Sequence, residues 1–222
     1  MNWNTLYRGY FLAKKLRSLA SSVLISHIFL VVTTVTPLYL IKELFTDEIL
    51  GFYTLTIGTL FLPTMLISIA VGSVYFERGI KISSSKESFM QHWFKTLSMC
   101  ISLSIPIFLV PLFFGEQIYS LFFGEEWLSS GTIAKVMSIP AMVGFISSAV
   151  DRTCIIAKNV YYGPIWHMVR AITTVILCLF VKIEGIAFID FIVLISAQMT
   201  LLYIADLVFQ FRFAYYIGKH NG

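Results

Sequence analysis

The sequence predicts an all-α protein, a polytopic membrane helix bundle of about six transmembrane helices with both ends on the cytoplasmic side. Of its 222 residues, 58% are hydrophobic and 13% are charged, whereas soluble domains carry about a quarter charged residues. Several apolar stretches approach the length of about 20 residues that a helix needs to cross the hydrocarbon layer. Lysine and arginine concentrate in alternate connections between these stretches.

The chain before the first apolar stretch, residues 1–19, mixes basic side chains with aromatic ones such as Trp3 and Tyr7. This mixture is typical of a segment that lies at the level of the lipid headgroups. We therefore expect an interfacial lead-in, followed by a six-helix bundle over residues 20–210 and a cytoplasmic tail over residues 211–222. The first apolar stretch has full length, which favours a spanning helix over a short cleavable signal segment.

The first two spans are expected over residues 20–41 and 49–76, and their short connection makes them an antiparallel pair. The stretch from Glu77 to Lys95 is too polar to remain in lipid without partners and is predicted to be a cytoplasmic loop. The third span is expected over residues 96–114.

The connection over residues 115–131 alternates apolar and acidic residues, and we expect it to lie along the outer surface. The last three spans are predicted over residues 132–157, 163–181 and 185–209, joined by very short turns.

Proline and cysteine within the spans are both expected to be structural. Pro63, Pro106 and Pro140 each remove a backbone donor inside a span, so they favour kinks. The three cysteines fall inside apolar stretches without the spacing of a metal or redox pair, and we expect them to pack inertly.

The distribution of basic residues predicts the orientation. Twelve of the sixteen lysines and arginines fall in the first segment, the tail, and the connections after the second and fourth spans, with Arg152 at the inner end of the fourth span counted among them. The other connections, with their span ends, hold Lys42, Lys135 and Lys182, and the remaining basic residue, Arg170, lies within a span. Because positive residues are retained on the cytoplasmic side, both termini are predicted there. The basic residues form no continuous patch, so nucleic acid is not an expected partner.

Arg170 is the best candidate for a functional residue. It lies about 10 Å into the fifth span by helical rise, and a charge near the bilayer centre costs roughly 2.5–3.5 kcal/mol. His167 precedes it by three residues, and Thr173 and Thr174 follow it, so one helix face carries a polar stripe. A guanidinium in this place could hold a phosphate bidentately. The alternatives are an arginine that snorkels to the inner surface and a histidine that only packs.

Two carboxylates of the sixth span are further candidates for a cavity that binds substrate. Asp190 lies near the outer end of this span and Asp206 near its inner end. Either could pair with a basic group or line a water-filled cavity, and solvation at the span end is the alternative. Asp151 and Arg152 are expected to be structural. The sequence carries no catalytic, cofactor-binding or metal-binding motif, so neither an enzyme nor a cofactor is expected.

Three segments carry a family resemblance: LGFYTLTIGTLFLPTMLISIAVGSVYF at Leu50 to Phe76, IYSLFFGEEWLSSG at Ile118 to Gly131, and KIEGIAFI at Lys182 to Ile189. Their order and spacing resemble the polysaccharide-transporter branch of the multidrug/oligosaccharidyl-lipid/polysaccharide flippase superfamily. The similarity is to the C-terminal half of a Wzx-type O-antigen flippase.

The resemblance implies translocation of an undecaprenyl-pyrophosphate-linked oligosaccharide across the bacterial inner membrane, between helical bundles that alternate in access. Family members place cationic residues in the path of this anionic substrate, which suits Arg170. The family typically has two similar halves, and this chain has room for one. We therefore expect a fragment that needs its missing second half, or a homodimer. The alternative function is a non-transporting membrane scaffold subunit of a polysaccharide-assembly complex.

Overall fold

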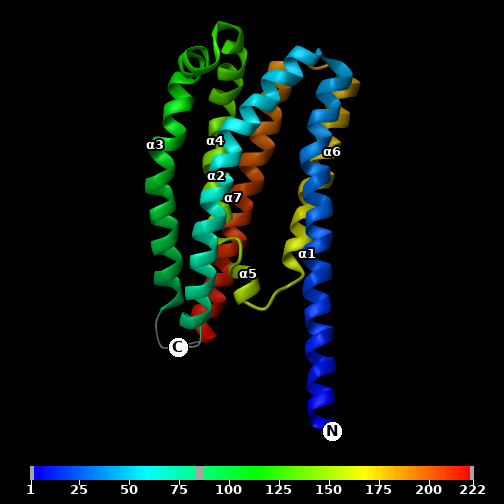
Figure 1. The fold of residues 1–222 in the computed structure, drawn as a ribbon, viewed down its shortest axis with the longest axis vertical. Coiled ribbons are helices and arrows are strands. Elements are labelled where there is room, and N and C mark those ends of the chain that lie inside the picture. The colour runs from blue at the N-terminus through cyan, green and yellow to red at the C-terminus, as the bar shows by residue number, and fades with distance from the viewer. Residues whose placement is uncertain (1–2, 84–87, 221–222) are drawn as a thin grey trace.

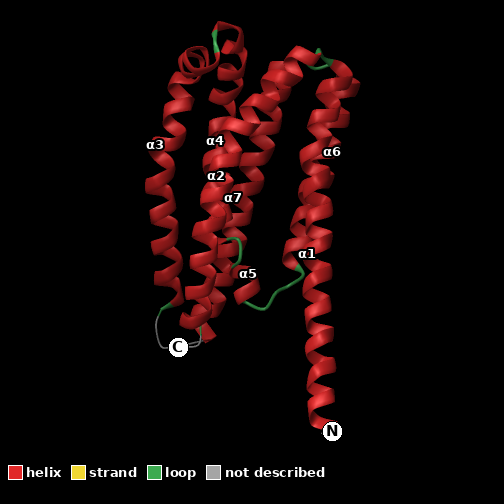
Figure 2. Cartoon of the chain, in the orientation of Figure 1, coloured by secondary structure: helices red, strands yellow, loops and turns green. Residues whose placement is uncertain are grey.

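The computed structural model describes the backbone of residues 3–83 and 88–220 and the side chains of residues 21–83 and 88–219. This part of the chain is all-helical, with 92% of the residues in helices and no strands (Figure 2). Six of its helices are long and apolar enough to cross a membrane, which confirms the predicted all-α bundle of about six spanning helices, and the orientation of the termini stays a prediction. The helices are α1 (Trp3–Leu44), α2 (Asp47–Ile82), α3 (Phe89–Phe123), η1 (Glu125–Trp127), α4 (Leu128–Val150), α5 (Thr153–Ile156), α6 (Tyr162–Glu184) and α7 (Phe188–His220).

The helices extend beyond the predicted spans at the end of the bundle where α1 begins and α7 ends, which we call the termini end (Figure 1). The predicted lead-in is continuous with α1, and the predicted tail continues α7 as far as His220. Most of the predicted loop from Glu77 to Lys95 is also helical; its residues 84–87 lie outside the described residues, as do residues 221 and 222 of the tail. Polar residues can extend a helix here because a helix satisfies its own backbone groups at any depth.

The connection over residues 115–131 is helical except at Gly124, and its predicted place along the outer surface stays a prediction. The backbone of α3 leaves helical geometry at Phe114 (φ −119°, ψ 21°) and then continues to Phe123. A Cβ added to Gly115 would lie 2.5 Å from the carbonyl oxygen of Gly131, so α3 and α4 touch backbone to backbone. Only glycine permits this approach, because it has no side chain to separate the helices.

The break in helical backbone geometry inside α3 does not fall at a proline, and the kinks predicted at Pro63, Pro106 and Pro140 stay a prediction. Helical backbone continues through Pro63 in α2 and Pro140 in α4. The break in α3 comes at Phe114, eight residues after Pro106 and three after Pro111. The helix of the predicted fourth span has a turn in it, since α4 ends at Val150 and α5 follows, and the candidate span runs over Glu125–Ile156.

The six long helices form two groups (Figure 1). In the larger group, α4 packs against α2, α3 and α7, and α4 is by far the most buried of the six. In the smaller group, α1 packs along α6. We call these groups the four-helix bundle and the α1–α6 pair. They are joined by the α1–α2 and α6–α7 connections at the end opposite the termini, and by residues 157–161, which run from α5 to α6 toward the termini end (Figure 1).

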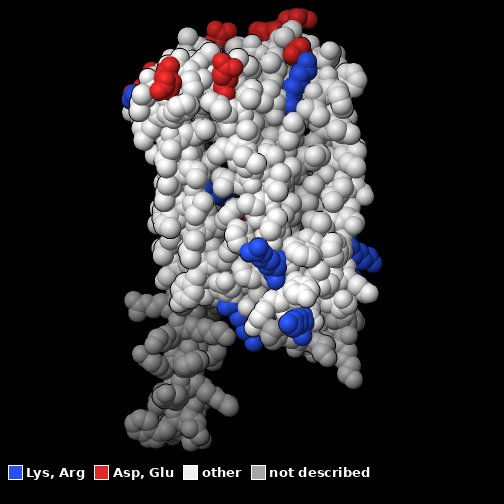
Figure 3. Space-filling model, turned by 180° about the vertical axis from the view of Figure 1, so that it is seen from behind, with Lys and Arg blue, Asp and Glu red and all other residues white. Residues whose placement is uncertain are grey.

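Charge separates along the molecule. On the face in Figure 3, acidic side chains gather at the end opposite the termini, which we call the acidic end, and most of the basic side chains lie toward the termini end. Each lysine near the acidic end has an acidic partner: Lys42 pairs with Asp47 at 3.3 Å, Lys135 with Glu116 at 2.9 Å, and Lys182 with Glu43 at 2.6 Å.

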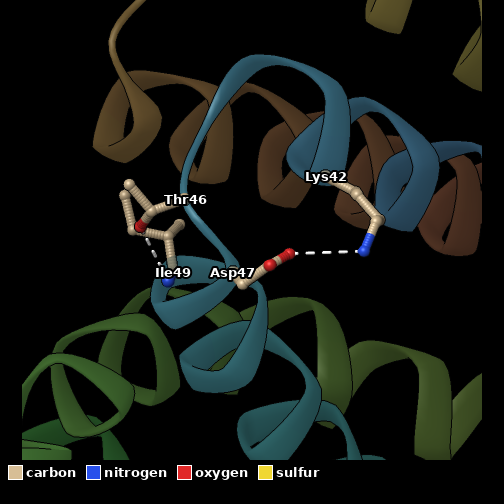
Figure 4. A network of polar contacts seen from close by, with 4 residues as sticks. All are labelled: Lys42, Thr46, Asp47 and Ile49. Carbon is tan, nitrogen blue, oxygen red and sulfur yellow. Dashed lines mark hydrogen bonds and ion pairs between the residues drawn. The ribbon is translucent and has the colours of Figure 1, made fainter.

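The turn between α1 and α2 is fixed by two short-range contacts (Figure 4). Lys42, in the last turn of α1, reaches Asp47 in the first turn of α2. Thr46 caps α2, its hydroxyl accepting a hydrogen bond from the backbone N–H of Ile49 at 3.3 Å. These contacts satisfy a free donor at the helix start and place a carboxylate at the positive end of the helix dipole.

Candidate functional site

A polar seam runs between α6 and α7, where the α1–α6 pair meets the four-helix bundle. On α6 its residues are Tyr162, Arg170, Thr173 and Thr174. On α7 they are Gln198, Tyr203, Asp206 and Gln210. Spacings of three and four residues bring side chains to the same face of a helix. The seam is therefore built from two polar stripes that face each other within otherwise apolar helices.

Arg170 is held against an aromatic ring of the neighbouring helix. Its Nη2 donates a hydrogen bond to the hydroxyl of Tyr203 at 3.1 Å, and its guanidinium carbon lies 4.9 Å from the centre of the same ring. A cation over an aromatic face gains electrostatic attraction that is larger away from water. The half-buried guanidinium is thus oriented toward α7.

A glycine of α4 makes room for this arrangement. A Cβ added to Gly144 would lie 2.8 Å from Cε2 of Tyr203, which is closer than real Cβ contacts come. The ring of Tyr203 therefore rests directly on the backbone of α4. The position of Arg170 depends in this way on a residue of a third helix.

Asp206 is buried, with 5% of its surface exposed, and it is surrounded by hydrogen-bond donors from three helices. Its carboxylate accepts from the Ser147 hydroxyl of α4 at 2.5 Å, from the Tyr162 hydroxyl of α6 at 2.6 Å and from Nε2 of Gln210 at 3.3 Å. The ion pairs found among the described residues involve neither Asp206 nor Arg170. Hydrogen bonds from neutral groups therefore hold this carboxylate in place.

The side-chain oxygen of Gln198 is buried and accepts no hydrogen bond from the described residues. Its Nε2 donates to the hydroxyls of Thr173 at 2.9 Å and Thr174 at 3.2 Å. Thr173 uses its own proton toward the backbone carbonyls of Val169 and Arg170, so it can only accept from Gln198. This fixes the orientation of the amide and leaves its Oε1 buried without a donor.

Other buried polar atoms of α6 and α7 are also without a partner in the described part of the chain: Nδ1 of His167, Oγ of Ser196 and Oε1 of Gln210. Buried polar groups are nearly always paired in folded proteins, and an exception calls for an explanation. Two helices that carry several such atoms along one seam can accept hydrogen bonds from hydroxyl groups or water.

The structure brings two of the four predicted site residues to the α6–α7 contact, Arg170 and Asp206. His167 lies three residues before Arg170 on α6, and its buried Nδ1 has no partner among the described residues. Asp190 is exposed in the first turn of α7, at the acidic end. It therefore shares no contact with the other three.

Several seam residues were not predicted from the sequence. Gln198 and Gln210 are uncharged but equally out of place in apolar helices, and this signal could have identified them. Tyr162, Tyr203 and Ser147 carry no such signal, because hydroxyl-bearing residues are frequent throughout the spans.

The seam offers a cation, several hydrogen-bond acceptors and flanking aromatic rings. Arg170 can bind a phosphate group through its remaining N–H donors, and the free oxygen of Gln198 can accept from a hydroxyl group. Tyr162 stacks on Trp166, with ring centres 5.9 Å apart, beside this region. Over the described residues, no group of three or more His, Cys, Asp or Glu side chains comes together as metal ligands.

Comparison with protein families matches residues 7–132 to a family described as "Polysaccharide biosynthesis protein". The matched segment covers most of α1, all of α2, α3 and η1, and the first turn of α4. The seam residues on α4, α6 and α7 lie beyond it. No curated protein and no solved structure matches the chain significantly.

Proposed function

The chain belongs to this family of polysaccharide biosynthesis proteins, and we propose that it translocates a lipid-linked oligosaccharide, carried on undecaprenyl pyrophosphate, across the bacterial inner membrane. The cell would use this lipid-linked sugar to assemble O-antigen or another surface polysaccharide. The coarser role in polysaccharide biosynthesis or transport follows from the family, and the six apolar helices make the chain a multi-pass membrane protein.

The placement of Arg170 is the observation that carries the proposal. A pyrophosphate linked to sugars cannot cross hydrocarbon without an enclosed polar path. Arg170 supplies a positive charge inside the spanning region without an ion-pair partner among the described residues. A carboxylate paired with it would compete with the phosphate for the guanidinium. Its hydrogen bond and ring contact with Tyr203 hold it in place and leave other N–H donors for a ligand.

The carboxylate of Asp206 has a different role in this proposal. Its charge would repel a phosphate, but hydrogen bonds from Ser147, Tyr162 and Gln210 already occupy it. We assign it to holding α4, α6 and α7 together next to the anion site. His167 and Gln198 would contact the part of the substrate that carries hydroxyl groups.

The charge distribution supports the proposed location, with both termini in the cytoplasm. Basic residues gather toward the termini end, and the lysines near the acidic end are paired with carboxylates. Membrane proteins retain lysine and arginine on the cytoplasmic side. The substrate would then enter from the termini end and leave at the acidic end.

We also propose that the six spans act with a second six-helix unit, because the two-halved transporters that the sequence resembles enclose their path between two such units. A second copy of the chain or a separate second half would supply it. Six spans return the chain to its starting side, so two copies can pair about an axis along the membrane normal.

Complementation tests this function directly. The 222-residue chain would be expressed in a bacterium that lacks its O-antigen flippase, and long-chain lipopolysaccharide would be measured on a gel. We expect long chains to be restored by this chain alone or with a second half. Failure of both, with the protein shown to be inserted, would contradict the proposal and favour the scaffold function.

The site assignment is tested by Arg170→Ala and Arg170→Lys at matched protein levels. We expect Arg170→Ala to abolish export, and we expect Arg170→Lys to retain only part of it, because lysine keeps the charge and loses the bidentate fork. Wild-type export by Arg170→Ala would show that this residue does not bind the substrate. A scaffold subunit would also tolerate the change.

A further inference from the structure

The α1–α6 pair packs against the four-helix bundle toward both ends of the molecule. At the acidic end, the pair adds four side chains to an apolar cluster that it shares with the bundle: Leu40, Ile41, Cys178 and Val181. Toward the termini end, aromatic rings of α6 and α7 pack on each other: Tyr162, Trp166, Phe209 and Phe213. The bundle also has a separate core there, to which no described residue of the pair contributes: Tyr75, Ile82, Phe89, Trp93, Val150, Ala214 and Ile217.

The two helices of the pair run parallel, with a constant offset along the chain. Near the start of α6, the Ser22 hydroxyl donates to the carbonyl oxygen of Val160 at 2.6 Å, across 138 residues of sequence. At the acidic end, Nζ of Lys182 lies 2.6 Å from Oε1 of Glu43, across 139 residues. A residue of α6 is therefore level with the residue of α1 that stands 138 or 139 positions earlier.

His167 lies on the side of α6 that contacts α1. It follows Gly163 by four residues, and residues with this spacing share a helix face. A Cβ added to Gly163 would lie 3.5 Å from Oγ of Ser26 on α1. Nδ1 of His167 is buried and has no partner among the described residues. Arg170 follows three residues later, so its side chain is a neighbour of the His167 ring along α6.

His27 of α1 faces the bundle and is exposed, so a ligand can reach it. It precedes Ile41 by fourteen residues, nearly four turns of about 3.6 residues each, so the two residues share a face of α1. Ile41 belongs to the cluster that the pair shares with the bundle. Nδ1 of His27 lies 2.8 Å from the carbonyl oxygen of Val23, which can only accept, so Nε2 is the nitrogen that gains a proton when the ring becomes charged.

These three basic side chains form a cluster without a paired carboxylate. His167 lies within electrostatic range of both Arg170 and His27. None of the three takes part in an ion pair among the described residues. Asp206 of α7 already accepts hydrogen bonds from three side chains. The cluster can therefore bind an anion without first giving up a partner.

The other charged groups of the neighbouring elements do not balance this cluster. Asp151 and Arg152, at the end of α4, act on each other and on Asp206. Lys158, in the connection before α6, is exposed. In α2, charged residues occur only in the first turn and from Glu77 onward.

We propose that His27, His167 and Arg170 together bind the two phosphate groups of a diphosphate, and that the site takes up protons as this ligand binds. The proposal rests on the proposed function, because it assigns the groups that hold the same substrate. His27 stands about five residues below the level of Arg170, or about 7 Å along the axis. This separation suits two linked phosphate groups better than a single one.

Proton uptake follows from the charges of the site. Without a ligand, neighbouring positive charges oppose protonation of the imidazoles, whereas a bound anion favours it. Histidine is the side chain that changes charge between about pH 5 and 8. A protonated ring donates from both nitrogens, so His167 can contact the diphosphate and a hydroxyl group of the adjoining sugar together.

Calorimetric titration of the full chain in detergent tests the site across this pH range. The probe is farnesyl diphosphate linked to N-acetylglucosamine, because both of its phosphates are diesters whose charge stays constant there. We expect the wild type to bind more tightly as the pH falls, by up to about tenfold per pH unit for each proton taken up. Titrations in buffers of different ionisation enthalpy count these protons directly.

Asparagine variants identify the groups that take up the protons. His27→Asn keeps an amide donor for the Val23 carbonyl and cannot become charged. We expect His27→Asn and His167→Asn each to weaken the dependence of affinity on pH, and the double variant to remove it. His92→Gln is the matched control, because this histidine of α3 bonds to the carbonyl oxygen of Tyr75 at 3.1 Å, away from the pair. It should behave as the wild type.

Two results would overturn the proposal: a wild-type affinity that does not change with pH, and an equal pH dependence in the wild type and the double variant. The proposed substrate would stand in both cases, because the probe binds. A chain that binds the probe in the expected way without restoring lipopolysaccharide would contradict the proposed function alone. Absence of binding at every pH would overturn both.

Discussion

At the residue scale, the position of Arg170 depends on a residue that carries no polar group. Gly144 of α4 lets the ring of Tyr203 lie against the backbone, and this ring in turn supports the guanidinium. A methyl group at position 144 would therefore push on the ring of Tyr203, and through that ring it would displace the guanidinium of Arg170. Glycine in a helix is otherwise unfavourable by about 1 kcal/mol relative to alanine.

We expect Gly144→Ala to lower the midpoint of thermal unfolding in detergent and to reduce export. Overpacking a core costs about 1–3 kcal/mol, which exceeds the gain in helix propensity. Gly58→Ala in α2 is the matched control, because a Cβ there has no neighbour within 4 Å. It should leave the midpoint unchanged or raise it. Equal behaviour of the two variants would show that Gly144 does not position Tyr203.

The sequence predicted the charged members of the seam and missed their neutral partners. An arginine or aspartate within an apolar span stands out because of its high cost in hydrocarbon. Tyr162 and Ser147 do not, since the role of a hydroxyl depends on which helix faces it. Asp190 was predicted as a site residue but lies outside the seam. Its place in the first turn of α7 becomes known only with the residue at which that helix begins.

At the element scale, the crossing of α3 and α4 depends on a pair of glycines. A Cβ on Gly131 would lie 2.5 Å from Cα of Glu116, and a Cβ on Gly115 would lie equally close to the carbonyl oxygen of Gly131. Backbone atoms on both sides cannot move aside as a flexible side chain would. Close approach of this kind is a main source of helix association in membranes.

We expect Gly131→Ala to separate α3 from α4 near the acidic end and to lower the midpoint of thermal unfolding by more than Gly144→Ala does. The reason is that the methyl group would meet fixed backbone, and at position 144 it would meet a side chain that can rotate. Size-exclusion profiles after heating would give both midpoints. A midpoint for Gly131→Ala equal to that of Gly58→Ala would contradict the close crossing.

Helix number was predictable, whereas helix ends and breaks were not. The six spans follow from hydrophobic length, which the membrane thickness imposes directly. The helix extends from Glu77 to Ile82 with the help of local contacts that a polarity pattern does not reveal. These are the ion pair between Lys81 and Glu77 and the hydrogen bond from the backbone N–H of Ser83 to the carbonyl oxygen of Gly79. The break at Phe114 likewise depends on how α3 meets α4.

At the scale of the whole molecule, the two ends of the bundle differ both in charge and in packing. The acidic end holds two of the three connections between the pair and the bundle, the paired lysines and the shared apolar cluster. The termini end holds the separate core of the bundle and most of the basic side chains. The expected inner face of the protein is thus the termini end, from which the substrate is proposed to enter, and this fits a substrate made in the cytoplasm.

Reporter fusions test this orientation. Green fluorescent protein fused after residue 222 should fluoresce, and alkaline phosphatase fused there should be inactive, because the termini are expected in the cytoplasm. Alkaline phosphatase inserted in the α1–α2 connection should be active.

Because lysine and arginine near the span ends set the orientation, replacing Arg78, Lys81 and Lys95 with glutamine should make a fraction of the phosphatase fused after residue 222 active. The same replacement of Lys42, Lys135 and Lys182 should not, since these lysines oppose the predicted orientation. An active phosphatase after residue 222 in the unaltered chain would reverse the orientation and place the proposed entrance on the outer face.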